Sequence, residues 1–214
     1  MTETNHRITL AQRPVGEVTA DCFASDEVEI PTPGPGEVLA KVGWLSIDPT
    51  IRGWMAMDTY LPAIEIGAEI RSGGLATVIE SKNDAIPVGT VLFGMTGWQE
   101  YVIMDDTNQA VPDGIDPTAA LSVFGVTGMT AYFGLLDVGR PVEGETVLVS
   151  GAAGATGSVV GQIAKLKGCR VVGLAGSDEK CAWLTDELGF DVAINYKTEN
   201  VADAIRAACP DGVD

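Results

Sequence analysis

The sequence is poor in the side chains that bind transition metals. Its 214 residues include one histidine, His6, and four cysteines that form no CxxC pair. A zinc site built from nitrogen and sulfur ligands therefore cannot be assembled in the usual way. Cysteines this sparse also argue against a disulfide scaffold, so we expect reduced thiols and a cytoplasmic protein.

Positive charge and long apolar runs are scarce as well. The 13 lysines and arginines are outnumbered by 30 aspartates and glutamates, which gives a formal net charge of −17 at pH 7. A surface this acidic repels a phosphate backbone, so we expect no nucleic-acid partner. The apolar runs are too short for a membrane span, and residues 1–10 lack the cationic start and apolar stretch of a signal peptide.

The chain does contain 46% hydrophobic residues, which is enough for a sizeable core. Up to about residue 124, short β-prone runs alternate with turn-forming glycine and proline, for example Pro33-Gly34-Pro35-Gly36. We predict strands over 38–42, 76–80, 90–93 and 100–103. This pattern is typical of a barrel-like or sandwich module, which we assign to residues 1–124.

From residue 125 onward, strands and helices alternate. We predict strands over 146–149, 170–174 and 192–195, and helices over 178–188 and 201–208. Another helix follows the first of these strands, because apolar residues are spaced by three and four at Val159, Val160, Ile163, Ala164 and Leu166. The order predicts an α/β domain with a doubly wound parallel sheet and right-handed crossovers over residues 125–214.

The loop from Gly151 to Gly157 joins a predicted strand to a predicted helix. Its small residues let the backbone approach a pyrophosphate, and the helix N-terminus offers free N–H groups and the positive end of its dipole. Gly157 allows the helix to pack closely on the strand. We therefore predict a dinucleotide phosphate site, and the alternative is a tight turn with no ligand.

The next strand bears on the choice between NAD and NADP. An NAD site expects a carboxylate about 20 residues after the glycines, to hold the ribose. Here the strand has no carboxylate at its tip. Ser177 and Lys180 can bind a phosphate and Tyr196 can cover the adenosine, which favours NADP. In the alternative, Ser177 is a helix N-cap, Lys180 is solvated, and Asp178 or Glu179 holds the ribose.

Recognisable segments occur in order along nearly the whole chain. They are 46–55 (SIDPTIRGWM), 60–62 (YLP), 65–67 (EIG), 97–101 (GWQEY), 125–134 (GVTGMTAYFG), 151–167, 176–180 (GSDEK) and 195–197 (NYK). Together they resemble the zinc-independent medium-chain dehydrogenase/reductases, in the branch of the prostaglandin, 2-alkenal and curcumin reductases. The resemblance implies a GroES-like catalytic domain, a Rossmann domain, NADPH, and reduction of carbon–carbon double bonds conjugated to a carbonyl group.

The resemblance also implies roles for individual residues. It places the cofactor phosphates at Gly154, Ala155, Thr156, Gly157 and Ser158, the 2′-phosphate side at Lys180 and Tyr196, and the nicotinamide cleft at Thr127 and Thr130. Zinc-dependent relatives carry ligands in regions where this chain has Ser46 and Ala68, so we expect no zinc.

Two residues, Tyr60 and Arg52, are candidates for contact with the substrate. Hydride addition to an enone leaves negative charge on the carbonyl oxygen, which a tyrosine hydroxyl or a cofactor ribose hydroxyl can stabilise. Tyr60 matches a tyrosine near the substrate in the curcumin reductase pattern, and the alternative is a packed aromatic. Arg52 meets an acidic substrate tail or the cofactor, or it pairs with a neighbouring carboxylate. Relatives usually carry tyrosine in place of Thr50, which leaves the identity of the unsaturated carbonyl substrate open.

Two other classes of function fit the same cofactor loop. One is a quinone reductase, and the other is a non-catalytic dinucleotide-binding module. Since three strands are half of a doubly wound sheet, we expect these 214 residues to be part of a longer chain. A homodimer is left open for the full-length protein.

Overall fold

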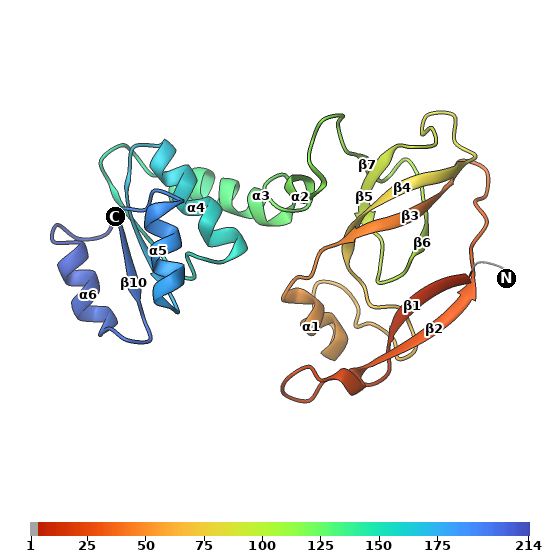
Figure 1. The fold of residues 1–214 in the computed structure, drawn as a ribbon, viewed down its shortest axis with the longest axis horizontal. Coiled ribbons are helices and arrows are strands. Elements are labelled where there is room, and N and C mark those ends of the chain that lie inside the picture. Colours follow the sequence, from red (N-terminus) through yellow and green to blue (C-terminus); the bar gives the residue numbers. More distant parts are fainter. Residues whose placement is uncertain (1–3) are drawn as a thin grey trace. The chain divides into compact units, whose positions relative to one another are not determined.

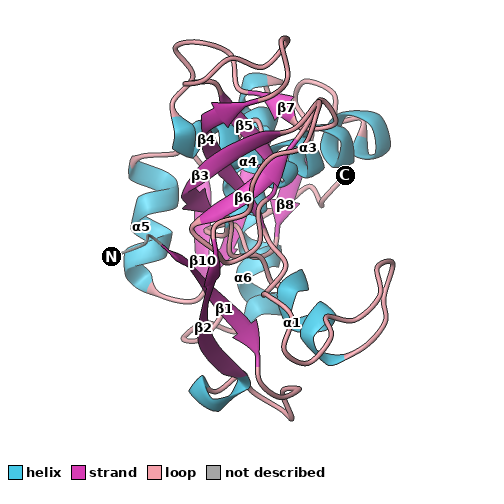
Figure 2. Cartoon of the chain, turned by 90° about the vertical axis from the view of Figure 1, so that its right-hand side faces the viewer, coloured by secondary structure: helices cyan, strands magenta, loops and turns pink. Residues whose placement is uncertain are grey.

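Two units, each with its own buried cores, form the computed structural model, which describes residues 4–214 (Figure 1). One unit ends at Leu121, and the other runs from Ser122 to Asp214. The first unit contains most of the strands, coloured magenta in Figure 2, and the second contains most of the helices, coloured cyan. Within residues 4–214, no helix combines the length and the apolar character needed to cross a membrane.

The first unit contains a five-stranded antiparallel sheet in the order β6-β3-β4-β5-β7. Its strands are β3 (Val38–Leu45), β4 (Gly73–Ser81), β5 (Val91–Met95), β6 (Tyr101–Met104) and β7 (Gln109–Ala110). Side chains alternate between the two faces of each strand, and Val38, Ala40, Ala76 and Val78 belong to one buried core. The four strands predicted for this region are confirmed.

A hairpin and a short helix build a second core in this unit. Strand β1 (Thr4–Leu10) pairs antiparallel with β2 (Phe23–Glu29), and the short helix η1 (Ala20–Cys22) lies between them in the chain. The other helices of the unit are α1 (Thr50–Ala56) and α2 (Pro117–Leu121). Buried side chains of β1 and α1, including Leu10 and Trp54, share this core. The buried Asn5 side chain ties β1 to β6 by donating to the carbonyl oxygen of Tyr101 at 3.0 Å.

The second unit contains a three-stranded parallel sheet in the order β10-β9-β8. Its strands are β8 (Thr146–Val149), β9 (Arg170–Ala175) and β10 (Val192–Asn195). Each strand is followed by a helix, in turn α4 (Ala155–Leu166), α5 (Asp178–Asp186) and α6 (Val201–Ala208). Before the sheet, α3 (Val126–Phe133) continues into a π-helical segment, η2 (Gly134–Gly139). The predicted α/β order with parallel pairing is confirmed.

Helices cover both faces of this sheet. Val171 and Ala175 of β9 lie in one core with Leu184 of α5, whereas Val172 lies in another core with Ile194. Residues of α6 pack against the second core. Figure 1 accordingly shows α5 and α6 on opposite sides of β10.

The apolar face predicted for α4 is confirmed only in part. Ala164 is fully buried and Val160 packs against the same core. Leu166 is 88% exposed, so its predicted place on the apolar face is wrong. It lies two positions after Ala164, which is about 200° around an α-helix, and it therefore points to solvent.

Candidate functional site

The turn from β8 into α4 leaves the first amides of a helix uncapped. Gly154 is the N-cap of this 12-residue helix, and no side-chain hydrogen bond caps it. The first N–H groups of an α-helix have no partner within the helix, so those of Ala155, Thr156 and Gly157 are donors for a ligand. Such an N-terminus is suited to bind a phosphate group.

The glycines let the backbone of this loop pack tightly. A Cβ placed on Gly157 would lie 2.5 Å from the carbonyl oxygen of Gly151 and 2.9 Å from the Cα of Ala152. Gly151 has a φ of +57°, which favours glycine. The amide of the fully buried Ala152 donates to the carbonyl oxygen of Leu174 in β9 at 3.0 Å. Residues 151–158 thus form a tightly packed loop of small residues, which we call the cradle. Its shape is suited to the phosphates of a dinucleotide.

All five residues predicted at the phosphates lie in or beside this cradle. Gly154 precedes α4, and Ala155, Thr156, Gly157 and Ser158 form its first turn. The Ser158 hydroxyl donates to the carbonyl oxygen of Ala155 at 3.3 Å. This loop therefore offers backbone amides, rather than the Ser158 hydroxyl proton, as donors for a ligand.

The residues predicted for the 2′-phosphate side lie beyond the ends of β9 and β10. Ser177 is the N-cap of α5 and accepts a hydrogen bond from the amide of Lys180 at 3.3 Å, as the alternative interpretation of Ser177 held. The Lys180 side chain is exposed, and Tyr196, which follows β10, is 48% exposed. Asp178 accepts a hydrogen bond from the Asn195 side chain at 2.6 Å. One of the two carboxylates considered for the ribose is thus already engaged.

The two threonines predicted at the nicotinamide lie on α3 in the second unit. The Thr127 hydroxyl donates to the carbonyl oxygen of Ser122 at 3.0 Å, and the Thr130 hydroxyl donates to that of Val126 at 2.7 Å. Because both protons are used within the unit, these side chains offer oxygen lone pairs, rather than protons, to a ligand.

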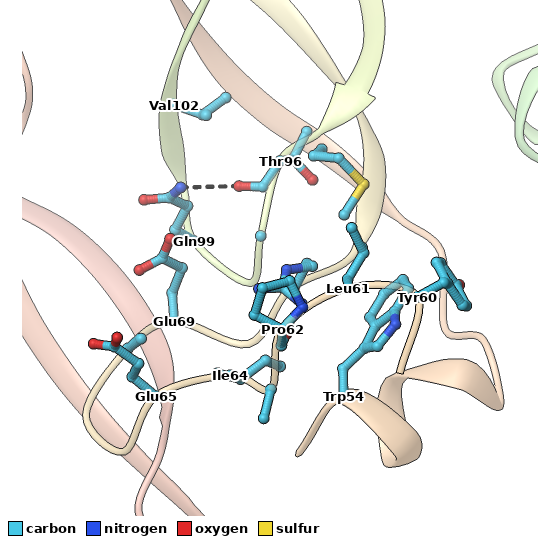
Figure 3. Close-up of a pocket in the computed structure, with 15 residues that line it drawn as sticks. Trp54, Tyr60, Leu61, Pro62, Ile64, Glu65, Glu69, Thr96, Gln99 and Val102 are labelled. Atoms are coloured by element: carbon cyan, nitrogen blue, oxygen red, sulfur yellow. Dashed lines mark hydrogen bonds between the residues drawn. The ribbon is translucent and has the colours of Figure 1, made fainter. Parts of the chain in front are cut away.

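A pocket of about 800 Å³ lies within the first unit (Figure 3). Trp54 and Tyr60 form one wall, with their rings edge to face and the centroids 5.9 Å apart. The Arg71 guanidinium lies 5.6 Å from the centroid of the Trp54 ring and donates to the carbonyl oxygen of Pro62 at 2.9 Å. This side of the pocket is aromatic and lies next to a positive charge.

The other side of the pocket is polar. Figure 3 shows Glu65, Glu69 and Gln99 across from Trp54 and Tyr60. The Gln99 side chain is held in place, because its nitrogen donates to the carbonyl oxygen of Thr96 at 2.9 Å. A pocket of this size with one apolar and one polar side suits a small amphipathic molecule.

The structure separates the two predicted substrate residues. Tyr60 lines the pocket and is 75% exposed, and its hydroxyl lies 3.1 Å from that of Thr50. When Thr50 donates in this pair, the Tyr60 proton is free for the oxygen of a ligand. Arg52 does not line this pocket, and its guanidinium donates to the carbonyl oxygen of Gly16 rather than to a carboxylate.

Sequence reasoning missed Arg71 as a residue of the pocket. A single arginine before a strand carries no pattern, and its place became visible only through its contact with Trp54. Trp54 lies in a buried core and also lines the pocket. Trp98 stacks on Phe23 with centroids 5.6 Å apart.

No metal centre is evident in the part of the chain that the structure describes. Within residues 4–214, no three histidine, cysteine, aspartate or glutamate side chains are arranged to hold a metal ion. Ser46, in one of the regions where zinc-dependent relatives carry ligands, donates to Asp48 at 2.8 Å. That the active protein contains no zinc remains a prediction.

Comparison with known protein families matches two parts of the chain. Residues 6–111 match a family described as the N-terminal domain of oxidoreductases. Residues 155–214 match a family described as zinc-binding dehydrogenases. The first match covers most of the β-rich unit, and the second begins at the first residue of α4.

Individual proteins match over almost the whole chain. The NADPH-dependent curcumin reductase of Escherichia coli (strain K12) is 42% identical over 215 residues, which cover 99% of this chain and 62% of that protein. Prostaglandin reductase 1 of Bos taurus is 44% identical over 212 residues, covering 96% and 62%. The crystal structure of CurA from Vibrio vulnificus in complex with NADPH matches with a TM-score of 0.92 at 43% identity, covering 98% and 63%. The chain thus spans less than two thirds of the length of these relatives.

Proposed function

Because this chain belongs to the medium-chain dehydrogenase/reductase family, we propose that it carries the substrate pocket and the cofactor site of an NADPH-dependent reductase. The reaction is the reduction of the carbon–carbon double bond of an α,β-unsaturated carbonyl compound, such as an enal or an enone. In this proposal, residues 1–124 are the GroES-like catalytic domain and residues 125–214 are the first half of the Rossmann domain.

The observation that carries the proposal is the cradle between β8 and α4. Its uncapped amides, from Ala155 to Gly157, would hold the pyrophosphate. Ser177, Lys180 and Tyr196 would contact the 2′-phosphate side of the adenosine, and Thr127 and Thr130 would line the nicotinamide site. The names of the E. coli and V. vulnificus relatives, which both specify NADPH, support this choice of cofactor.

The pocket of the first unit is the proposed substrate site. Bound NADPH would supply a hydride to the β-carbon of the substrate. Negative charge then develops on the carbonyl oxygen, and a positioned donor stabilises it. The Tyr60 hydroxyl can donate to that oxygen while Thr50 donates to Tyr60, since the two hydroxyls lie 3.1 Å apart. The aromatic wall formed by Tyr60 and Trp54 would contact the conjugated part of the substrate.

We also propose that the reaction needs no zinc. The chain has one histidine, and Ser46 and Ala68 occupy regions where zinc-dependent relatives carry ligands. Elemental analysis of the purified protein should find no stoichiometric zinc, and chelators should leave activity unchanged. One tightly bound zinc ion per chain would contradict the proposal.

An assay of NADPH consumption tests the activity. Enals, enones and quinones are offered in parallel with NADPH and with NADH, and we expect oxidation of NADPH with enals and enones. Turnover of quinones alone would favour a quinone reductase, and no turnover with any acceptor would contradict the reductase proposal. Lys180→Ala should lower the NADPH/NADH preference by about tenfold or more, which is the effect of losing one charge-assisted hydrogen bond.

A further inference from the structure

The segment after β10 crosses the end of β9. Tyr196 follows β10 directly, and its amide donates to the carbonyl oxygen of Ala175, the last residue of β9, at 3.1 Å. This contact brings Tyr196 and Lys197 to the carboxyl ends of the parallel strands, the edge at which ligands bind in doubly wound sheets.

Gly176 provides the surface on which these two side chains lie. A Cβ placed on Gly176 would be 2.6 Å from the Tyr196 hydroxyl oxygen, 2.9 Å from the Cζ of Tyr196 and 3.4 Å from the Cε of Lys197. A larger side chain at this position would have to displace the Tyr196 ring. The carbon that carries the Lys197 ammonium group thus lies against the tip of β9, next to the Tyr196 hydroxyl.

Asn195 forms hydrogen bonds with two carboxylates near the tip of β9, those of Asp178 and Glu199. Its side chain, buried with 5% exposure, donates to Asp178 at 2.6 Å, and its backbone N–H donates to the Glu199 carboxylate at 2.8 Å. Its side-chain oxygen accepts a hydrogen bond from the amide of Lys197 at 3.1 Å. Asn195 therefore fixes both carboxylates and the backbone that presents Lys197.

Two cations at this edge of the sheet have no carboxylate partner among the described residues. Lys180 and Lys197 are both exposed, and neither takes part in an ion pair among residues 4–214. Glu179 is the one other acidic side chain in the first turn of α5. Three exposed carboxylates, Asp178, Glu179 and Glu199, lie in the same region, and Asn195 holds two of them, Asp178 and Glu199, by hydrogen bonds. Lys180 and Lys197 therefore stay available to an external anion.

We propose that Lys197 binds the 2′-phosphate of NADP(H) beside Tyr196, and that Asn195 is a positioning residue that keeps Asp178 from taking the place of that phosphate. The inference rests on the proposed function and adds two residues to its cofactor site. An unbound Asp178 would repel a phosphate and would accept a hydrogen bond from a ribose hydroxyl, as the acidic residue of an NAD site does. The pair Asn195–Asp178 therefore acts on the choice between the two cofactors.

Calorimetric titration of the full chain with adenosine 2′,5′-bisphosphate and with 5′-AMP tests the role of Lys197 without any turnover. Lys197→Ala should weaken bisphosphate binding by about tenfold and leave AMP binding unchanged. The control is Lys167→Ala, which removes an exposed lysine at the C-terminus of α4 and should change neither affinity. Unchanged bisphosphate binding by Lys197→Ala would overturn the assignment.

A double variant tests the role of Asn195. Asn195→Ala should weaken bisphosphate binding because it frees Asp178, and adding Asp178→Ala should restore most of the lost affinity. A double variant as weak as Asn195→Ala would show a merely structural role and overturn this part. A wild-type chain that binds the bisphosphate no more tightly than AMP would instead contradict the NADP assignment of the proposed function.

Discussion

The proposed cofactor cradle and the proposed substrate pocket are built in different ways. The cradle consists of consecutive residues from Gly151 to Ser158, and backbone atoms do most of its packing and present its donors. The pocket is made by side chains from segments as far apart as Trp54 and Val102. A site made by the backbone of one segment leaves a pattern of small residues in the sequence, whereas a site made by scattered side chains does not.

Among changes that affect only one of the two sites, substitution of Trp54 should have the largest effect on stability. This side chain is 7% exposed and lies in the core of the first unit. Trp54→Ala should lower the free energy of unfolding of that unit by about 3–5 kcal/mol, because it leaves a large cavity. Denaturant titration measures this loss. Trp44→Ala, at a position that is 49% exposed, is the matched control and should cost less than about 1 kcal/mol.

The second unit has its own core, so the Trp54 variant should keep its affinity for adenosine 2′,5′-bisphosphate. Loss of that affinity together with the stability of the first unit would show that the two sites are coupled.

The next largest effect is expected for a substitution in the cradle, which should lower both stability and NADPH affinity. Gly157→Ala adds a carbon 2.5 Å from the Gly151 carbonyl oxygen, and the backbone must shift to accept it. Overpacking of this kind costs about 1–3 kcal/mol, and NADPH binding should weaken as the amides move. Gly134→Ala is the control, since nothing lies within 4 Å of the added carbon. Thermal unfolding and a fluorescence titration with NADPH measure both quantities, and wild-type affinity in Gly157→Ala would argue against a phosphate site in this loop.

The same contrast explains how much could be predicted from the sequence. Strands β8, β9 and β10 and helices α4, α5 and α6 follow a regular alternation of apolar runs, and they were placed to within a few residues. Helices α3 and η2 of the same unit were not predicted. Helix α1 was not predicted, because seven residues with Gly53 in the middle show no helical period. The pocket could not be predicted either, since Arg71 and Gln99 meet Trp54 only through the fold. Tyr60 was singled out by family resemblance alone.

A smaller effect is expected at the hydroxyl pair of the pocket. Tyr60→Phe and Thr50→Val each remove one partner of the 3.1 Å contact. Tyr60→Phe should lower kcat/KM for an enone by up to about tenfold, the equivalent of one hydrogen bond, and Thr50→Val should lower it less. Both variants should bind NADPH as the wild type does. Steady-state kinetics with one enone measures this effect. An unchanged kcat/KM in Tyr60→Phe would show that Tyr60 contributes only its ring to the pocket wall.

The smallest effect belongs to an ion pair outside both sites. Burial opposes ionisation of Asp191, but hydrogen bonds from Lys165 at 2.8 Å and from the Val171 amide at 2.6 Å outweigh it and lower the pKa of this carboxyl. Ionised Asp191 therefore stabilises the fold above its unfolded pKa of about 3.9, and this contribution is lost as the pH falls through the lower folded value.

Asp191→Asn should cost about 1 kcal/mol at pH 7 and less as the pH drops below about 4. Urea unfolding of both proteins at several pH values measures this difference. A stability difference that does not change with pH would contradict the role given to the charge of Asp191.

We expect the second unit to select NADPH over NADH. With a net charge of −17, the chain as a whole repels the more highly charged NADPH more strongly than NADH, so a preference for NADPH must come from local cations such as Lys180. Calorimetric titration with each cofactor at one fixed ionic strength measures this preference directly. The account predicts that NADPH binds at least about tenfold more tightly than NADH. Equal affinities, or tighter binding of NADH, would contradict it.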